Sequence, residues 1–285
     1  MAKIDETYHR LLEKILTEGE TYEDPNRKGI LRVQIPRFTL EHSFSDGFPA
    51  LTTKKMFLRG VNEETLWVLR GDTNVRTLQD KGVHIWDQDY KNHVDRGNKD
   101  NGDLGRIYGY QLRSFGGKFD QLAWIVDTMR NNPRSTKKTV TYINPNDKEH
   151  QALTPCHTGF KVLVSGEGFY IQWEQDSVDT FLGLPFNIIF YANVGYFLGA
   201  VTGLKPLGIV GDLSNVHIYE PHLSAVRTQL GNDPKKYPPS TMSGWENMTN
   251  LSVDEALSRL DAKSFSLNNY KSYPPITAKM IPYTK

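Results

Sequence analysis

Cysteine is nearly absent from this sequence: Cys156 is the only one among 285 residues. A single cysteine excludes an internal disulfide and a zinc site built from several thiolates. Two roles remain open for it, a buried inert thiol or a nucleophile, and free cysteines more often behave as small buried hydrophobes. Any thiol chemistry in this chain must therefore take place at Cys156.

The sequence also lacks an excess of charge and a long apolar run. The formal net charge is +1 with 24% charged residues, which excludes a global basic field for nucleic acid or acidic membranes. The longest apolar segment, 188–201, is shorter than the roughly 20 residues of a membrane span. Met1 precedes a polar, charged stretch instead of a signal peptide. We expect a soluble cytoplasmic protein with no metal, membrane or nucleic-acid partner.

Apolar periodicity predicts both helices and strands. Apolar residues at helical spacing predict helices, and β-rich runs around a glycine-bearing turn predict a hairpin. The expected helices are 5–18, 60–70, 120–130, 188–201 and 253–260, and the expected strands are 31–40, 160–164, 169–173 and 207–219. The tail from 270 to 285 is expected to be extended. No linker or repeat divides the chain, so we expect one domain over residues 1–285.

Three features could carry chemistry on this framework. Cys156 lies just before the predicted hairpin, where a strand can present it to a pocket. Glu63 and Glu64 lie among the apolar positions of their helix, which is costly for an acid unless it is paired or used. A solvated charge on the helix surface is the alternative. The basic cluster Arg130, Arg134, Lys137 and Lys138 is by default a solvated face, with phosphate binding as the alternative.

Several motifs in order resemble those of the folate-dependent thymidylate synthase family, which includes the pyrimidine hydroxymethylases. The likeness extends from about residue 8 to residue 280. The motifs are 47–49 with 52–54, 64–74, 85–87, 102–109, 153–157, 175–179, 182–188, 217–219 and 273–276. The resemblance implies an α+β fold on a large mixed β-sheet with surrounding helices. It also implies a homodimer in which two such sheets pack face to face.

The resemblance implies a reaction as well. In that family, a cysteine adds to C6 of a pyrimidine nucleotide, and C5 then attacks the methylene of 5,10-methylenetetrahydrofolate, the co-substrate. Loss of the C5 proton and of the folate amine leaves an exocyclic methylene. A hydride from tetrahydrofolate converts this methylene to a methyl group, whereas water converts it to a hydroxymethyl group. A thiol of ordinary pKa, about 8.5, needs activation for the first step.

The matching positions imply roles for individual residues. Cys156 is the expected nucleophile, Glu64 relays protons through water, and Tyr108 removes the C5 proton. His157 joins a water network, and Asn187 reads the base edge, since an amide supplies both donor and acceptor. The other expected site residues are His217 and Tyr219 for the sugar hydroxyl, Asp179, Trp86 and Gly183 for the folate, and Gln175, Asp176, Ser177, Lys137 and Arg27 for the remaining substrate contacts.

The phosphate site departs from the family pattern. Four arginines, two of them from the partner subunit, hold the 5′-phosphate in the family, and the matching positions here are Pro25, Thr136, Lys137 and Asp176. A carboxylate at 176 would repel a phosphate dianion. Nearby cations could rebuild a displaced phosphate site: Arg27, Lys28, Arg32, Arg134, Lys137 and Lys138. We favour the alternative, a substrate other than an ordinary nucleoside 5′-monophosphate.

Three functions remain open at this point. Asn187 favours methylation of a uracil-type substrate, because cytosine-specific relatives tend to carry aspartate there. The divergent phosphate site favours a hydroxymethylase of a modified-nucleotide pathway. The third possibility is a catalytically inactive homologue that only binds nucleotide or folate. The joint presence of Cys156, Glu64, Tyr108 and Asn187 argues against a loss of catalytic activity.

Overall fold

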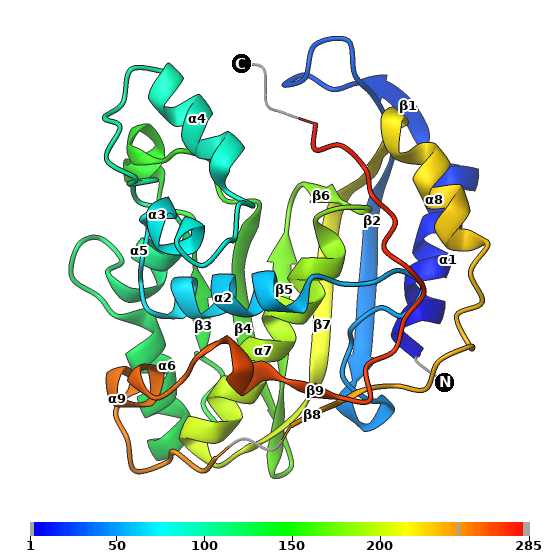
Figure 1. Cartoon of the computed structure of the whole chain (residues 1–285). Helices are drawn as coiled ribbons and strands as arrows, with labels where there is room; N and C mark the ends of the chain where they lie inside the picture. The colour runs from blue at the N-terminus through cyan, green and yellow to red at the C-terminus, as the bar shows by residue number, and fades with distance from the viewer. Residues whose placement is uncertain (1–2, 244–245, 282–285) are drawn as a thin grey trace.

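The structure, a computed structural model that describes residues 3–243 and 246–281, is built around one large mixed sheet (Figure 1). The strands of this sheet are β1 (Glu20–Glu23), β2 (Leu31–Ser43), β3 (Thr139–Thr141), β4 (His157–Ser165), β5 (Gly168–Gln175), β6 (Val178–Asp179) and β7 (Lys205–Tyr219). Their order is β1-β2-β7-β5-β4-β3, and β6 pairs with β7. β2 and β4 run antiparallel to their neighbours β7 and β5, whereas β5 and β7 are parallel. The predicted α+β class with a large mixed sheet is confirmed.

Helices and short strands surround this sheet. The helices are α1 (Lys3–Glu18), α2 (Leu58–Leu69), α3 (Val75–Gln79), α4 (Asp87–Asp95), α5 (Tyr108–Arg113), α6 (Gln121–Asn131), α7 (Leu184–Thr202), α8 (Leu223–Leu230) and α9 (Val253–Ser258). Short 3-10 turns are η1 (Phe44–Asp46), η2 (Pro145–His150), η3 (Glu220–His222) and η4 (Ala262–Phe265), and β8 (Thr241–Met242) pairs with β9 (Leu267–Asn268). All five predicted helices are present. The predictions missed α3, α4, α5 and α8.

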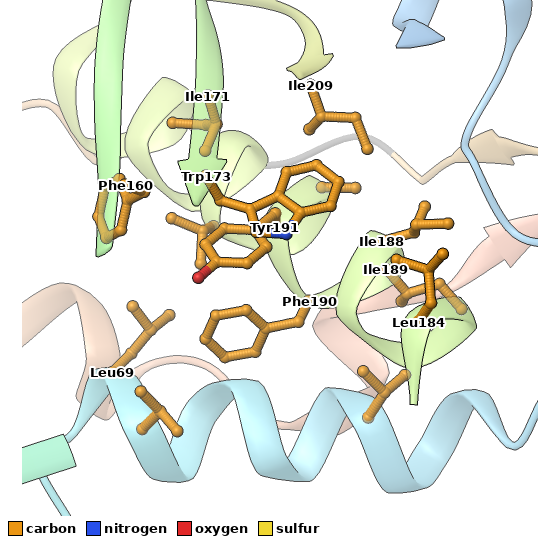
Figure 2. Close-up of a cluster of buried hydrophobic side chains, with 14 of the residues drawn as sticks. Leu69, Phe160, Ile171, Trp173, Leu184, Ile188, Ile189, Phe190, Tyr191 and Ile209 are labelled. Atoms are coloured by element: carbon orange, nitrogen blue, oxygen red, sulfur yellow. The ribbon is translucent and has the colours of Figure 1, made fainter. Parts of the chain in front are cut away.

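Helix α7 forms the centre of the core between the sheet and α2 (Figure 2). Tyr191 of α7 stacks on Trp173 of β5 with ring centroids 4.9 Å apart and planes at 15°. Phe190 meets the Tyr191 ring edge-on at 5.1 Å. By length and composition α7 could cross a membrane, but 78% of its most apolar window is buried inside the fold. This burial is typical of a core helix that is apolar on all sides.

The β4–β5 hairpin fixes the position of the cysteine. His157 pairs with Gln175, and the register shifts between His157 and Gly159. Just before β4, the carbonyl of Cys156 accepts a hydrogen bond of 2.8 Å from the amide of Asp176. Cys156 therefore lies at the end of the hairpin that faces the first turn of α7.

The C-terminal segment up to residue 281 runs as extended chain past the sheet and ends near the β1–β2 loop (red in Figure 1). The amide of Tyr273 donates to the carbonyl of Thr52, and the carbonyl of Lys279 bonds with Nε2 of His222. Arg27 donates from Nε to the carbonyl of Ile281 at 3.1 Å. The predicted extended conformation is confirmed for residues 270–281, and 282–285 lie outside the described residues.

Candidate active site

Cys156 is half-buried and lines a pocket between α2, the first turn of α7 and the ends of β4 and β5. The pocket is also lined by Glu64, Val68, Trp86, Tyr108, His157, Gln175, Ser177, Asp179, Gly183, Asn187 and Phe190. Burial raises the pKa of the Cys156 thiol to about 11, and the carboxylate of Asp89 adds to this shift while Arg27 opposes it. The thiol is therefore protonated at neutral pH until a reaction partner removes its proton.

Tyr108 fixes the backbone of the cysteine. It is the first residue of α5, and its hydroxyl oxygen accepts hydrogen bonds from the amides of Cys156 at 2.8 Å and His157 at 3.4 Å. Burial raises the Tyr108 pKa well above its usual value, so the hydroxyl keeps its proton. With its lone pairs taken by two amides, the hydroxyl is left with one hydrogen to donate.

Glu64 supplies an acid whose protonation changes near neutral pH. It lies on α2, and Nε1 of Trp86 donates to its Oε1 at 2.9 Å. Burial raises the Glu64 pKa to about 7, although the bond from Trp86 acts in the opposite direction. A carboxyl group with such a pKa both gives and takes protons under ordinary conditions, as a proton relay requires.

His157 and Asn187 are locked by neighbouring side chains. Nδ1 of His157 lies 2.9 Å from the Tyr191 hydroxyl, and burial lowers the His157 pKa to about 4, opposed by a hydrogen bond with Asn187. His157 is therefore neutral near pH 7. The Asn187 Oδ1 accepts from Nε2 of Gln175 at 3.1 Å, which orients the amide in the first turn of α7.

Asp179, the last residue of β6, and Gly183, the N-cap of α7, flank the turn that joins these two elements. The Asp179 Oδ1 accepts from the amides of Phe181 at 3.0 Å and Leu182 at 3.1 Å, which holds the carboxylate at the pocket wall. Gly183 packs closely against this turn: a Cβ at residue 183 would lie 3.1 Å from the Asp179 carbonyl oxygen. A side chain at 183 would require the Asp179 backbone to shift by a few tenths of an ångström.

His217 lies beside Asp179 in the β6–β7 register. Its Nδ1 lies 2.7 Å from the carbonyl of Asn215, and burial lowers the His217 pKa, so the ring is neutral with its hydrogen on Nδ1. Nε2 is then an acceptor, and it is buried with no hydrogen-bond partner in the described part of the chain. Such an orphaned acceptor fits a hydroxyl of a bound ligand.

Comparison with known protein families decides what kind of site this is. A family model described as thymidylate synthase matches residues 6–282 of the chain. The chain belongs to the thymidylate synthase family. This family carries out folate-dependent one-carbon transfer to C5 of a pyrimidine, in general with methylenetetrahydrofolate as co-substrate. The resemblance found in the sequence is confirmed.

The structure brings most of the predicted site residues of this thymidylate synthase family member to one place. Cys156, Glu64, Tyr108, His157, Asn187, Asp179, Gln175, Ser177, Trp86 and Gly183 line the pocket. Asp176 lies between two lining residues, and Arg27 lies 5.0 Å from the ring of Tyr219, which contacts His217. The roles assigned to these residues stay predictions.

Three of the cations proposed for a rebuilt phosphate site, Lys137, Lys138 and Arg32, do not line the pocket. Lys137 is exposed in the connection between α6 and β3 and does not line the pocket of its own chain. The Lys138 ammonium is buried and donates to the carbonyls of Pro133 and Ser135, and Arg32 pairs with Asp24 at 2.8 Å. Lys138 is therefore held within its own loop, which argues against it as a phosphate ligand. Arg32 acts electrostatically on His217 and Tyr219, and phosphate binding by Arg32 stays a prediction.

Sequence reasoning also missed residues that shape the pocket. Val68 lies four residues after Glu64 on α2, and Phe190 lies three residues after Asn187 on α7, so helical spacing could have found both. Asp89, whose carboxylate raises the Cys156 pKa, gave no comparable signal. It lies on α4, a helix whose polar composition hid it from periodicity analysis.

Proposed function

We propose that this member of the thymidylate synthase family methylates C5 of a uracil-type pyrimidine nucleotide or nucleoside. One observation carries the proposal: a thiol, a proton-relaying carboxyl and a base-reading amide line the same pocket. They are Cys156, Glu64 and Asn187, and Tyr108 bonds directly to the amide of the cysteine. Methylenetetrahydrofolate supplies the one-carbon unit and the hydride in this reaction.

The orientation of Asn187 supports uracil as the base. Uracil presents an N3–H donor and an O4 acceptor, and cytosine interchanges the donor and acceptor at these two positions. A cytosine bound in the same place would therefore need the Asn187 amide rotated. That rotation would set its NH₂ group against Nε2 of Gln175, which now donates to the Asn187 oxygen. Two opposed donors are unfavourable, so Gln175 selects the uracil orientation.

The protein side chains have distinct parts in the proposed reaction. Cys156 passes its proton through water to the ionised form of Glu64 as its sulfur bonds to C6, and the electron pair of the C5–C6 double bond becomes available at C5 to bond the transferred carbon. The C5 proton then leaves to a water molecule that accepts the free hydrogen of the Tyr108 hydroxyl, and Glu64 delivers the proton it took up to the departing folate nitrogen. After hydride reaches the transferred carbon, the sulfur–C6 bond breaks and the methylated base is released.

The folate ring fits the wall formed by Trp86, Asp179 and Gly183. Trp86 offers an aromatic face, and Asp179 offers a fixed carboxylate as acceptor for the N–H groups of a pterin. The carboxylate is held by two backbone amides, so it needs little reorganisation when the ring binds.

The apolar part of the pocket favours hydride over water in the last step. Val68, Trp86 and Phe190 are all buried and line the pocket beside the polar groups. An apolar wall over the reacting carbon lowers the local concentration of water. We therefore expect a methyl product, with the hydroxymethyl group as the alternative.

Product mass tests the function directly. The protein is incubated with methylenetetrahydrofolate and uracil or cytosine nucleotides and nucleosides, with ribose or deoxyribose, and products are weighed by mass spectrometry. The methyl and hydroxymethyl products differ by one oxygen atom. We expect a methylated uracil product that Cys156→Ala abolishes and that Ser165→Ala, at the exposed far end of β4, preserves. Absence of turnover with every substrate would leave only a binding protein.

A further inference from the structure

We infer that the substrate of Cys156 is a pyrimidine nucleoside with a free 5′-hydroxyl, not a nucleoside 5′-monophosphate. This inference rests on the proposed C5 transfer and names the substrate class of the same pocket. Its basis is the charge and bonding of the residues next to the cysteine, where the sugar must lie.

The position of the sugar follows from the pyrimidine ring itself. C6, which the Cys156 sulfur attacks, is adjacent to N1, the atom that carries the sugar. N3, which faces Asn187 in the proposed pose, lies across the ring from C6. The sugar and its 5′ substituent therefore leave the ring on the side of Cys156, away from Asn187. His217, with its orphaned Nε2, and Tyr219 lie on the strand next to this region.

A carboxylate occupies the cysteine side of the pocket. The Asp176 amide donates to the Cys156 carbonyl at 2.8 Å, so the two residues are adjacent across the end of the hairpin. Asp176 is exposed and is flanked by Gln175 and Ser177, both of which line the pocket. A phosphate dianion beside this carboxylate would be repelled, whereas a hydroxyl can donate a hydrogen bond to it.

The cations on this side are already engaged by the protein. Arg27 pairs with Asp24 at 3.6 Å, donates to the carbonyl of Ile281 and lies over the ring of Tyr219. Arg32 pairs with the other oxygen of Asp24 at 2.8 Å. The Asp24 side chain is fully buried, so both guanidiniums are held by one carboxylate that cannot turn to solvent.

A second carboxylate adds to the negative character of this region. Asp89 on α4 acts electrostatically on the Cys156 thiol and on Arg27 and Arg96. Arg96 in turn donates to the carbonyl of Ala152. Arg27 and Arg32 thus pair with Asp24, and Arg27 and Arg96 act on Asp89. Asp176 and Asp179 add further negative charge near the cysteine. A dianion entering here would have to displace existing pairs, but a neutral 5′-hydroxyl would not.

Paired kinetic measurements test the inference on the full-length protein. The probes are deoxyuridine against its 5′-monophosphate, and uridine against its 5′-monophosphate, each with methylenetetrahydrofolate. We expect kcat/KM to favour the nucleoside by at least about tenfold, the factor that corresponds to one modest charge repulsion. Asp176→Arg is expected to shift that ratio by about tenfold or more toward the monophosphate, and Asp176→Asn by a smaller factor in the same direction. Asp127→Arg, with the same charge change on the exposed face of α6, should leave the ratio unchanged.

The outcomes separate this inference from the proposed function. Turnover that favours the monophosphate overturns the substrate class but leaves C5 transfer intact, and it would indicate cations supplied by a second copy of the chain. If neither ligand is turned over, the proposed function fails and calorimetric binding decides the substrate class. Tighter binding of the nucleoside supports the inference; tighter binding of the monophosphate, or binding of neither, overturns it.

Discussion

The protonation states of single residues in the pocket are set by burial. Glu64 is the clearest case, because its pKa is raised to about 7 although Trp86 donates a hydrogen bond to it. The pKa of the Cys156 thiol is raised as well, so near pH 7 the thiol holds its proton while Glu64 exchanges its own. Both shifts reflect the cost of placing a negative charge in a poorly solvated site.

Replacing Glu64 by glutamine separates its chemical role from its effect on stability. Glu64→Gln is expected to lower kcat by about 100-fold or more, because general acid–base groups contribute about 100- to 10,000-fold to rates. The wild-type pH–rate profile should show an inflection near pH 7 that the variant lacks. Steady-state kinetics between pH 5 and 9 measures both effects.

The stability of the same variant should depend on pH with a definite sign. In the unfolded chain Glu64 releases its proton near its ordinary pKa, but in the fold it keeps the proton to about pH 7. Stability is therefore lost as pH rises from the unfolded to the folded pKa. Relative to the wild type, the free energy of unfolding of Glu64→Gln should be about 3 kcal/mol more favourable at pH 8 than at pH 4, as measured by urea unfolding. Glu63→Gln is the control. Glu63 pairs with Lys81 outside the pocket, so its replacement should leave turnover unchanged.

At the scale of elements, α2 carries Glu64 and is tied to its neighbours by buried amides. Asn193 of α7 donates to the Asn62 Oδ1 at 3.1 Å and to the Thr65 hydroxyl at 3.3 Å. Asn62 donates onward to the carbonyls of Ala262 and Phe265 around η4. Helix α2 is thus hydrogen-bonded to the core helix α7 and to the C-terminal region around η4.

Removing this clamp should weaken the fold measurably. Asn193→Ala leaves the buried Asn62 oxygen without its donor and opens a small cavity, so we expect a loss of about 2–3 kcal/mol in the free energy of unfolding. Urea denaturation followed by tryptophan fluorescence measures the loss. Asn131→Ala, at an exposed position of α6, should change stability by less than about 0.5 kcal/mol. Equal effects of the two substitutions would show that the amide pair does not hold α2.

The elements that sequence reasoning found are those with a strong apolar pattern. The hairpin from 160 to 173 and the helix from 188 to 201 stood out because their buried sides are dense in large apolar residues. Helix α4 was missed because His93 is its only buried residue, so it has no apolar face to detect. Its Asp89 was missed for the same reason.

Charge gave less reliable predictions than apolarity. Lys138 belongs to a basic cluster that looked like a solvated face, yet its ammonium is buried among carbonyls of its own loop. Arg130 donates to the carbonyls of Val201 and Leu251 instead of facing solvent alone. A charged side chain finds its partner through tertiary contacts, and neither spacing nor composition records them. Site residues were predictable only where whole motifs matched a family.

On the scale of the whole molecule, the sheet has a second face that α7 does not fill. Residues that pair directly across neighbouring strands point to the same face of a sheet. Thr39, Asp212 and Glu174 therefore lie on one face, and so do Val210 and the residues paired with it on β2 and β5. These side chains are exposed or half-buried, and Leu163 at the hairpin end is 41% exposed. We propose that a second copy of the chain covers this face.

Substitution at the centre of this face tests the dimer. Val210 is half-buried and pairs with Glu41 on β2 and Gln172 on β5. Light scattering should give a mass near twice 32.5 kDa for the wild type. Val210→Glu would place a second carboxylate opposite Glu41 in a buried interface and should raise the dissociation constant by at least about 100-fold, or about 3 kcal/mol. Phe119→Glu, at an exposed apolar position outside the sheet, should leave the dimer intact. A wild-type protein that stays at 32.5 kDa at micromolar concentration would refute the proposal, and the pocket would then have to be complete within one chain.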